Sequence, residues 1–397
     1  MAKHNPLRFA HPFFTDTPIA ARKPIPGVGR RMTDFVQGTL EKIPAPKRNP
    51  PRMTLQDIVG ADGTKAIDAS GAISFHAAGD SGHTGGATED MQEFVADAMS
   101  ADVDINKPAS SPAFFFHLGD VIYYDNTDRG YHEQFYVPYK RYPGKIIAIP
   151  GNHDGERFKF DGKPTGQKDT LEAFTKNFLQ PKPGIPSAAG TIFREMVSQP
   201  GVFWRLDAPY VDIVALYSNI AEGPGFIGGQ TIGDRQTKWL AQELKAIKAD
   251  RAANRKALII AVHHPPFSNG SHASSAQMLA DIDAACAAAK IQPDLVLAAH
   301  SHDYERYTRF VPGAQGEQQI PFIVAGGAGR GLSPKVAPAD RVRHGDLTYE
   351  KSLRGYGYLK ITIDRQKIDV VFFEVEQGGK KSRFDSVSVD LRTGKIA

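Results

Sequence analysis

The chain has 397 residues, of which 41% are hydrophobic and 23% are charged, and its formal net charge at pH 7 is +4. This composition is typical of a globular protein that buries a sizeable core. It argues against a membrane-spanning protein, because no apolar run approaches the roughly 20 residues that a transmembrane helix needs.

Cysteine usage and the first residues of the chain bear on the compartment. Cys286 is the only cysteine, which excludes an internal disulfide and fits a reducing compartment. It lies in an alanine-rich helical stretch and is expected to be a small core residue. The N-terminus has no apolar stretch ahead of a small-residue cleavage site. We therefore expect a cytoplasmic protein with no membrane partner.

Residues 1–60 differ from the rest of the chain in composition. They contain ten Lys and Arg residues against four Asp and Glu residues, and nine of the 28 prolines. Proline fixes φ and lacks a backbone donor, so such a segment cannot form interior helix or central strand. We expect a proline-rich, basic N-terminal arm at residues 1–60 and one further domain at residues 61–397. Basic segments of this kind are more often a solvated surface than a binding arm, so no nucleic-acid partner is expected.

After residue 70, short β-branched and aromatic runs recur, and each ends in a polar or glycine-rich loop. Amphipathic helices are predicted between several of these runs, at residues 88–100, 169–179 and 234–247, the last with Asp234 as its N-cap. This alternation predicts an α/β fold with a sheet core. Three C-terminal strands joined by short turns predict an antiparallel meander. The short runs that precede these three C-terminal strands are "AISFHAA", "AFFFHL", "KIIAIP", "VDIVALYS", "ALIIAV", "DLVLAA" and "PFIVAG".

The residues that end the runs share a chemistry. Three runs are followed by "GDSG", "GDVIYYD" and "GNHD", and two later runs by "HHPP" and "HSHDYER". In open α/β sheets, ligands bind outside the carboxyl ends of the strands, so we expect these polar residues to form one site. Carboxylate, amide and imidazole ligands together suit Fe, Mn or Zn. One carboxylate can bridge two ions about 3.5–4 Å apart, an arrangement suited to attack on phosphorus.

This ordered set resembles the calcineurin-like metallophosphoesterases. Within them it is most similar to the purple acid phosphatases, whose signature is GDxG, GDxxY, GNH[DE], VxxH and GHxH. Here the motifs read GDSG, GDVIY, GNHD, AVHH and AHSH, with Ala299 in place of the last glycine. Many metallophosphoesterases have a histidine ligand in the first motif, where this chain has Gly82. This chain supplies Tyr123 in the second motif, and that exchange is the mark of purple acid phosphatases.

The resemblance implies a site for two metal ions, Fe(III) and a divalent Fe, Zn or Mn. The family spacing selects His263 as a ligand rather than its neighbour His264, and adjacent strand residues point to opposite faces. The implied ligands are Asp80, Tyr123 and His302 for the ferric ion, Asp120 as the bridge, and Asn152, His263 and His300 for the divalent ion.

Two further histidines are candidates for contact with the substrate. The resemblance implies that His153 faces the substrate, where it binds a phosphate oxygen or protonates the leaving group. His272 lies where plant relatives have a substrate-facing histidine, and an exposed loop histidine is the alternative. Tyr124, next to Tyr123, is expected to face away into packing. The glycine-rich residues 326–350 predict a long loop at one rim of the site.

The resemblance also implies a fold and an activity. The implied fold of residues 61–397 is α/β, with two stacked mixed β-sheets flanked by helices in a four-layer αββα sandwich. The implied activity is hydrolysis of a small-molecule phosphomonoester by attack of a metal-bound hydroxide on phosphorus. A phosphodiesterase or nucleotidase with the same metals is one alternative. A catalytically silent metal-binding scaffold is another, but a scaffold has no use for the proton donor His153.

Overall fold

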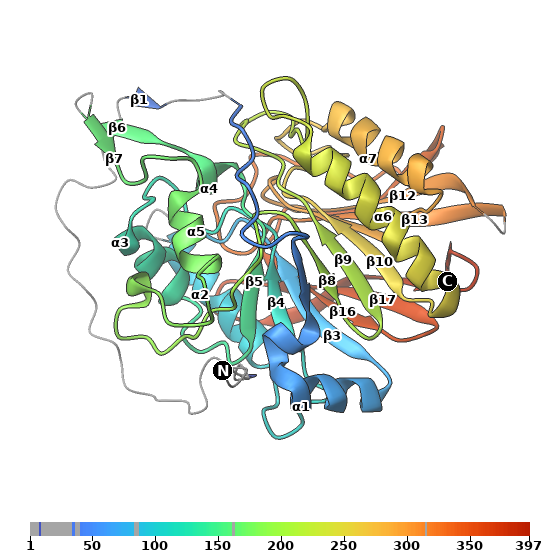
Figure 1. The fold of residues 1–397 in the computed structure, drawn as a ribbon, viewed down its shortest axis with the longest axis horizontal. Coiled ribbons are helices and arrows are strands. Elements are labelled where there is room, and N and C mark those ends of the chain that lie inside the picture. Colours follow the sequence, from blue (N-terminus) through green and yellow to red (C-terminus); the bar gives the residue numbers. More distant parts are fainter. Residues whose placement is uncertain (1–7, 9–33, 36–39, 83–86, 161–162, 314–315) are drawn as a thin grey trace.

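Two large β-sheets stack face to face at the centre of the protein and carry helices on their outer faces (Figure 1). This arrangement confirms the expected α/β fold with two mixed sheets. None of the described helices is long and apolar enough to cross a membrane. The structure is a computed structural model that describes Arg8 and residues 34–35, 40–82, 87–160, 163–313 and 316–397.

One sheet has seven strands in the order β19-β18-β17-β16-β3-β4-β5. Strands β3, β4 and β5 are parallel, and β16 pairs with β3 in the antiparallel sense. Strands β16, β17 and β18 form the predicted antiparallel meander. The bounds are β3 Ile73–Ala78, β4 Phe114–His117, β5 Lys145–Ala148, β16 Gly357–Ile363, β17 Lys367–Val375, β18 Lys381–Asp390 and β19 Lys395–Ile396.

The other sheet has nine strands in the order β14-β15-β12-β13-β11-β10-β9-β8-β2. Its central strands β9, β10, β11 and β13 are parallel, and antiparallel strands flank them on both sides. The bounds are β2 Arg52–Thr54, β8 Trp204–Asp207, β9 Val211–Ala215, β10 Ala257–Ala261, β11 Leu295–Ala298, β12 Tyr304–Gly313, β13 Gly316–Ala325, β14 Arg343–His344 and β15 Leu347–Leu353.

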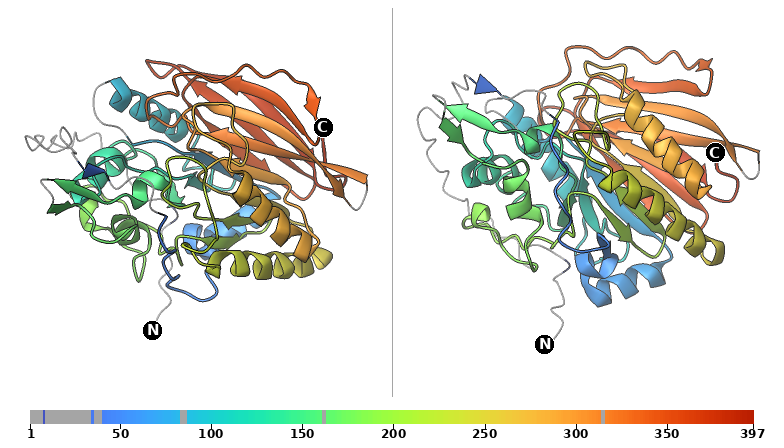
Figure 2. Two further views of the ribbon diagram at one scale, coloured as in Figure 1. Left: turned by 90° about the horizontal axis from the view of Figure 1, so that it is seen from above. Right: turned by 45° about the horizontal axis from the view of Figure 1, so that its top comes forward.

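Helices form the outer layers of the sandwich. Seen from above, α2 lies on one side of the sheets and α6 and α7 lie on the other (Figure 2). A small sheet of β1 Asp34–Phe35, β6 Phe158–Phe160 and β7 Lys163–Thr165 lies apart from both large sheets. The helices are α1 Leu55–Ser70, α2 Ala87–Ser100, α3 Asp128–Tyr131, α4 Asn152–Gly155, α5 Glu172–Phe178, α6 Arg235–Ala253 and α7 Ala276–Ala289, with short turns of π-helix at His132–Tyr136 and 3-10 helix at Ser187–Ala189.

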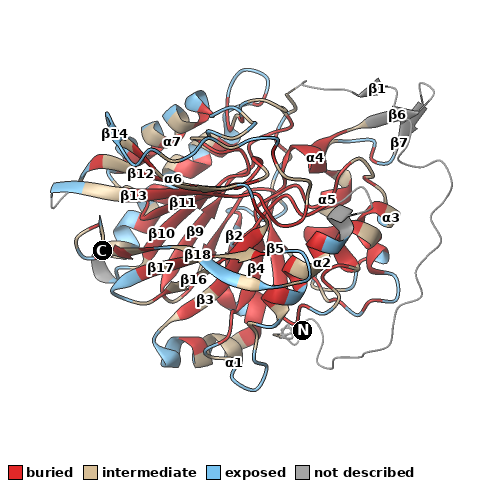
Figure 3. Ribbon diagram, turned by 180° about the vertical axis from the view of Figure 1, so that it is seen from behind, coloured by how far each residue is buried: buried red, intermediate tan, exposed pale blue. Residues whose placement is uncertain are grey.

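Side chains of the strands alternate between two cores, because successive residues of a strand point to opposite faces. Along β4, Phe114 and Phe116 join the core between the sheets, whereas Phe115 packs in the outer core beneath the helices. Phe116 meets Trp204 of the opposite sheet with ring centroids 5.3 Å apart. Figure 3 shows that the strands of both sheets are buried along most of their length.

The predicted helices are present, with shifted ends. Helix α5 is shorter than predicted, since Leu171 before it takes a left-handed φ of 62°. Helix α6 begins after the predicted N-cap Asp234 and continues to Ala253. Helix α1 was not predicted, and Gly60 interrupts it with a φ of 75°. Glycine weakens a helix, so the helical pattern of residues 55–70 is not evident from the sequence.

The predicted loop at residues 326–350 is wrong in its second part. Residues 343–344 and 347–353 form β14 and β15, which pair with each other and extend the nine-stranded sheet beside β12. The division into an arm and a domain at residue 60 stays a prediction. Most of residues 1–39 lie outside the described part of the chain, while β2 and the start of α1 pack onto the body.

The contact between Phe116 and Trp204 predicts how much the packing between the two sheets contributes to the free energy of unfolding. Substitution Phe116→Ala should lower the free energy of unfolding by about 3–5 kcal/mol, because it leaves a cavity between the sheets. The matched control is Phe193→Ala, whose side chain belongs to a residue that is 48% exposed and should change stability by no more than about 0.5 kcal/mol. Urea unfolding at equal metal content would measure both, and equal effects would contradict the assignment of the core.

Candidate metal centre

The strand ends that were predicted to form one site meet at one edge of the sandwich. Asp80, Asp120 and Asn152 follow β3, β4 and β5 of the seven-stranded sheet, and His263 and His300 follow β10 and β11 of the nine-stranded sheet. All five are buried. The backbone N–H of His300 donates a hydrogen bond of 2.7 Å to Asp80 Oδ2, which joins the two sheets at the site.

The backbone turns sharply at three of these strand ends. Asp80, Asp120 and His300 have φ values of 59°, 53° and 67°, in the left-handed region that residues other than glycine rarely adopt. Such conformations cost of order 1–3 kcal/mol each and persist where the surroundings hold them. Gly151 allows a close approach, because a Cβ at this position would lie 2.1 Å from Asp120 Oδ1. The chain therefore accepts strain to aim these side chains inward.

Three predicted ligands form one half of the site. The Tyr123 hydroxyl donates a hydrogen bond of 3.1 Å to Asp80 Oδ1 and lies 3.2 Å from His302 Nε2. His302 Nε2 lies 3.7 Å from the same oxygen of Asp80. A carboxylate, a phenol and an imidazole thus converge on one point, and together they could hold a hard metal ion.

Four predicted ligands form the other half. His263 Nε2 lies 3.2 Å from Asp120 Oδ2 and 3.2 Å from Asn152 Oδ1. One ligand atom each from Asp120, His263 and His300 lies within 4.8 Å of the others, a spacing that could hold a metal ion. Asp80 Oδ1 is 3.9 Å from His263 Nε2, so the two halves adjoin each other.

Backbone carbonyls orient two of the imidazoles. The Nδ1 atom of His263 lies 2.9 Å from the Leu118 carbonyl oxygen, and Nδ1 of His302 lies 2.8 Å from the Gly331 carbonyl oxygen. Because a carbonyl only accepts, each Nδ1 must donate, and Nε2 of each ring is then the nitrogen that could bind a metal ion. Metal-ligating histidines almost always have such a partner on their other nitrogen.

The chemistry of this donor set fits a bound cation. Asp120 Oδ2 is buried and makes no hydrogen bond within the described part of the chain. Burial, with the nearby Asp120 carboxylate, raises the pKa of Asp80 well above its usual range. Burial lowers the pKa of His302 to about 3, which leaves the imidazole neutral, the form that binds metals. Buried carboxylates are costly unless they are paired or coordinate a metal.

His264 lies beside His300, with ring centroids 4.2 Å apart, but its ring nitrogens bond to other groups. Its Nδ1 lies 2.7 Å from Ser218 Oγ and its Nε2 lies 2.8 Å from the Ala221 carbonyl oxygen. Both ring nitrogens of His264 therefore have protein partners, whereas Nε2 of His263 faces Asp120 and Asn152. The arrangement favours His263 as the ligand of the pair.

His153 lies beside the predicted ligands and is held by carboxylates. Its ring centroid is 4.4 Å from that of Tyr123. Its Nδ1 is 2.9 Å from Glu156 Oε1, and its Nε2 is 3.8 Å from Glu222 Oε2. Burial opposes the charged form, but attraction to Glu156 and Asp120 prevails and raises the pKa of His153 to about 10. His153 could thus contact an anionic ligand and transfer a proton.

His272 also lies at the site. Its ring centroid is 4.2 Å from that of His300 and 5.6 Å from that of His302. The residue is half-buried rather than exposed. Of the two interpretations of His272, this position favours a histidine that faces the substrate.

Sequence reasoning missed three charged residues around the predicted ligands. Glu156 contacts His153, and its place two residues after the GNHD motif was a usable signal. Glu222 hydrogen-bonds to Asn152 Nδ2 at 3.1 Å, and no motif marks it. Arg330 follows the end of β13, where its guanidinium carbon lies 4.5 Å from the centre of the Tyr123 ring. The strand-end rule that found the ligands could have found Arg330 too.

The prediction for Tyr124 is wrong. This residue has a left-handed φ of 58°, and its ring centroid lies 5.2 Å from that of His153. Its hydroxyl oxygen accepts a hydrogen bond of 3.3 Å from Arg330 Nη2. The left-handed backbone turns the ring toward the site, which simple alternation along an extended chain does not predict.

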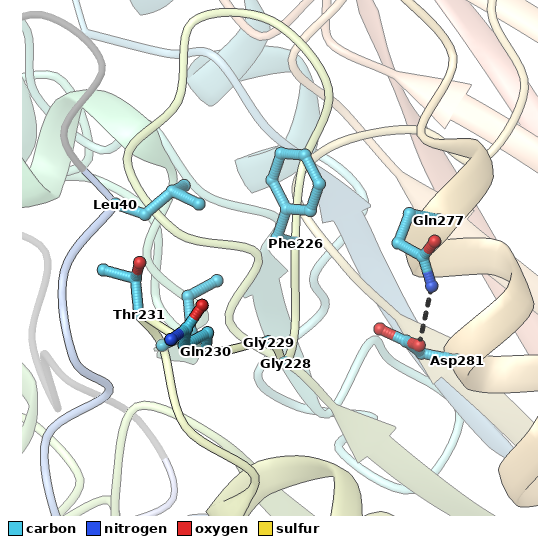
Figure 4. A pocket seen from close by; sticks show the side chains of 9 residues that line it. Leu40, Phe226, Gly228, Gly229, Gln230, Thr231, Gln277 and Asp281 are labelled. Atoms are coloured by element: carbon cyan, nitrogen blue, oxygen red, sulfur yellow. Dashed lines mark hydrogen bonds between the residues drawn. The ribbon is translucent and has the colours of Figure 1, made fainter.

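A separate surface hollow of about 300 Å³ lies between the loop after β9 and helix α7 (Figure 4). Phe226, Gln277 and Asp281 line it, together with the backbone around Gly228. None of the predicted ligands is among its lining residues. The hollow is therefore distinct from the cluster of strand-end residues.

Two stacked mixed sheets with polar residues at their strand ends define the metallophosphoesterase fold. The chain belongs to the calcineurin-like phosphoesterase family, whose sequence model matches residues 74–304. The matched segment contains every predicted metal ligand. A comparison with curated protein sequences gives no significant match.

Solved structures show similarity at low sequence identity. A purple acid phosphatase from yellow lupin (Lupinus luteus) seeds aligns with a TM-score of 0.50 and 14% identity, over 80% of this chain and 54% of that one. This chain therefore spans about half of the lupin protein. A dimetal phosphatase from Danio rerio aligns with a TM-score of 0.45 and 11% identity, over 80% of this chain and 99% of that one. At its identity, the lupin likeness shows the fold alone.

The adjacent histidines provide a matched test of the metal ligands. We expect His263→Asn to lower the metal content of the purified protein, because it removes an imidazole between Asp120 and Asn152. His264→Gln should retain the metal, because it changes a ring that is already bonded to Ser218 and Ala221. Elemental analysis of both variants would measure this. Loss of metal from the His264 variant alone would contradict the assignment.

Proposed function

We propose that this protein is a dinuclear metal-dependent phosphomonoesterase of the purple acid phosphatase type. The observation that carries the proposal is the position of Tyr123, whose hydroxyl lies 3.1 Å from Asp80 Oδ1 and 3.2 Å from His302 Nε2. A phenolate beside a carboxylate and an imidazole is a donor set suited to a ferric ion. Membership of the calcineurin-like phosphoesterase family supports the phosphoester substrate.

The proposal assigns a role to each ligand of the site. When bound, the two ions supply a water of lowered pKa and stabilise negative charge on the phosphate oxygens. The left-handed backbone at Asp80, Asp120 and His300 sets the directions in which these side chains leave the strand ends. The proposed ligands are Asp80, Tyr123 and His302 for the ferric ion, Asn152, His263 and His300 for a divalent Fe, Zn or Mn ion, and Asp120 as the bridge.

His153 is the proposed proton donor to the leaving group. Its Nδ1 lies 2.9 Å from Glu156 Oε1, so the carboxylate of Glu156 fixes the orientation of the ring. The Nε2 atom then faces the opposite side, where Glu222 stands 3.8 Å away with a side chain that is 43% exposed. The side chain of His153 itself is 8% exposed, and we place the leaving group on the Glu222 side of the ring. His153 can therefore reach the ester oxygen of a bound substrate through Nε2.

The absorption spectrum tests the proposed ferric site directly. We expect about two metal ions per chain, including iron, and a visible charge-transfer band from the Tyr123 phenolate. Substitution Tyr123→Phe should abolish the band, because it removes the oxygen that lies beside Asp80 and His302. Elemental analysis and visible spectroscopy of both proteins, purified without added metal, would check this.

The outcome of that experiment separates the enzyme classes. Two metal ions without a visible band would exclude the purple acid phosphatase type and would favour a Mn or Zn phosphodiesterase. Relative rates on p-nitrophenyl phosphate and bis(p-nitrophenyl) phosphate would then identify the preferred ester. A wild-type protein with both metals and no hydrolysis of either ester would contradict the enzymatic proposal.

The contact between Glu156 and His153 predicts a dependence on the leaving group. We expect Glu156→Gln to slow hydrolysis of an alkyl phosphate such as 2-glycerol phosphate about 10- to 100-fold. The same variant should slow p-nitrophenyl phosphate much less, because p-nitrophenolate leaves without a proton. His153→Ala should show the same pattern with a loss of about 10²- to 10⁴-fold on the alkyl ester.

The control for this series is Glu172→Gln, which removes a carboxylate on helix α5 that pairs with Lys176. It should leave both rates unchanged. Equal losses on the alkyl and nitrophenyl esters would show that Glu156 supports the structure of the site and not the proton transfer.

A further inference from the structure

Arg330 is fixed to the same loop that carries Asp80. Its backbone N–H donates a hydrogen bond of 2.9 Å to the Asp80 carbonyl oxygen, and Ala328 N–H donates one of 3.1 Å to the Gly79 carbonyl oxygen. Gly329 between them has a φ of 144° and packs so closely on α2 that a Cβ would lie 2.5 Å from Gln92 Cβ. The Cα of Arg330 is therefore held rigidly relative to a proposed metal ligand.

Two tyrosines orient the guanidinium group. Its central carbon lies 4.5 Å from the centre of the Tyr123 ring and 5.4 Å from that of Tyr124, and Nη2 donates a hydrogen bond of 3.3 Å to Tyr124 Oη. Tyr124 also meets His153 edge to face, with ring centroids 5.2 Å apart. Arg330 and His153 thus both stand against the pair of tyrosines that lies beside the proposed ferric half of the site.

The charges around the site are unevenly distributed. Glu156 and Glu222 lie next to His153, and Glu222 also contacts Asn152 in the half proposed for the divalent ion. Arg330 places a positive charge against Tyr123, in the half proposed for the ferric ion. Arg330 therefore offers a positive charge to an anionic substrate on the Tyr123 side. The guanidinium fork also matches two phosphate oxygens, which a single ammonium cannot do.

We propose that Arg330, held by Tyr124, is a substrate-binding residue that contacts a non-bridging oxygen of the phosphate and selects phosphomonoester dianions over phosphodiesters. The inference rests on the proposed function and adds the residue that selects the monoester. A monoester dianion presents three terminal oxygens that share two charges, so an oxygen would remain for Arg330 if bound metal ions engaged the other two. A diester has two terminal oxygens and one charge, and it gains less from the guanidinium.

Variants of Arg330 test this inference in two independent measurements. The first is the affinity of the metal-loaded protein for inorganic phosphate, measured by titration calorimetry, which requires no turnover. We expect Arg330→Gln to weaken phosphate binding about 10- to 100-fold, since a hydrogen bond to a charged group is lost. Arg330→Lys should recover part of the affinity, because it restores the charge without the fork. Tyr124→Phe should cause a smaller loss of the same kind.

The second measurement is the ratio of kcat/KM for p-nitrophenyl phosphate to that for bis(p-nitrophenyl) phosphate. Arg330→Gln should lower this ratio about tenfold, with most of the loss on the monoester. The matched control Arg341→Gln removes the same charge from an exposed position of the same loop and should change neither measurement. Metal content, measured in parallel, should be equal in all variants.

The outcomes distinguish this inference from the proposed function. Unchanged phosphate affinity in Arg330→Gln, or an equal loss on both esters, would overturn the role of Arg330 while leaving the phosphoesterase intact. If Arg330→Gln weakens phosphate binding while the wild-type protein hydrolyses neither ester, the Arg330 contact is supported and the enzymatic function is rejected. Equal loss in Arg341→Gln would show a general electrostatic effect and would also overturn the specific contact.

Discussion

The structure depends on the burial of two carboxylates, Asp80 and Asp120, where two β-sheets meet. Both side chains are fully buried, and one oxygen of Asp120 has no hydrogen-bond partner in the described part of the chain. An uncompensated buried charge costs far more than a typical hydrogen bond returns. The surrounding backbone is strained as well, with left-handed φ values at both residues. A protein tolerates this combination where a bound ligand stabilises it, and carboxylates beside imidazoles form a donor set suited to a metal cation.

The sandwich provides the rigidity that such a site requires. Each half of the site draws residues from both sheets, so neither sheet could form a half alone. One of the bonds that join the sheets belongs to the site itself, because the Asp80 side chain accepts the backbone N–H of His300. Second contacts then orient the rings, through the carbonyls of Leu118 and Gly331. The same strand-end residues join the two sheets and form the proposed site, which explains why the strand ends are both polar and deeply buried.

The sequence predicted the sheet core and the ligand cluster because both are local signals. A run such as "KIIAIP" ends at "GNHD", and the carboxyl ends of parallel strands meet at one edge. The positions of Glu222, Tyr124 and Arg330 were not predictable in this way. Glu222 reaches the site from a long loop that carries no motif. Tyr124 turns toward the site because its backbone φ is left-handed, and a tyrosine in the sequence gives no sign of such a conformation. Helix α1 was missed because Gly60 and Gly63 weaken the helical pattern.

The sharing of each half between the two sheets has a mechanical consequence. Ions bound to the proposed ligands would connect the two sheets at this edge. No disulfide can do so, because the chain has a single cysteine. Separation of the sheets and release of the ions then become one event, because anything that binds only the folded state stabilises it. The supply of metal ions would thus affect the stability of the folded sandwich as well as its activity.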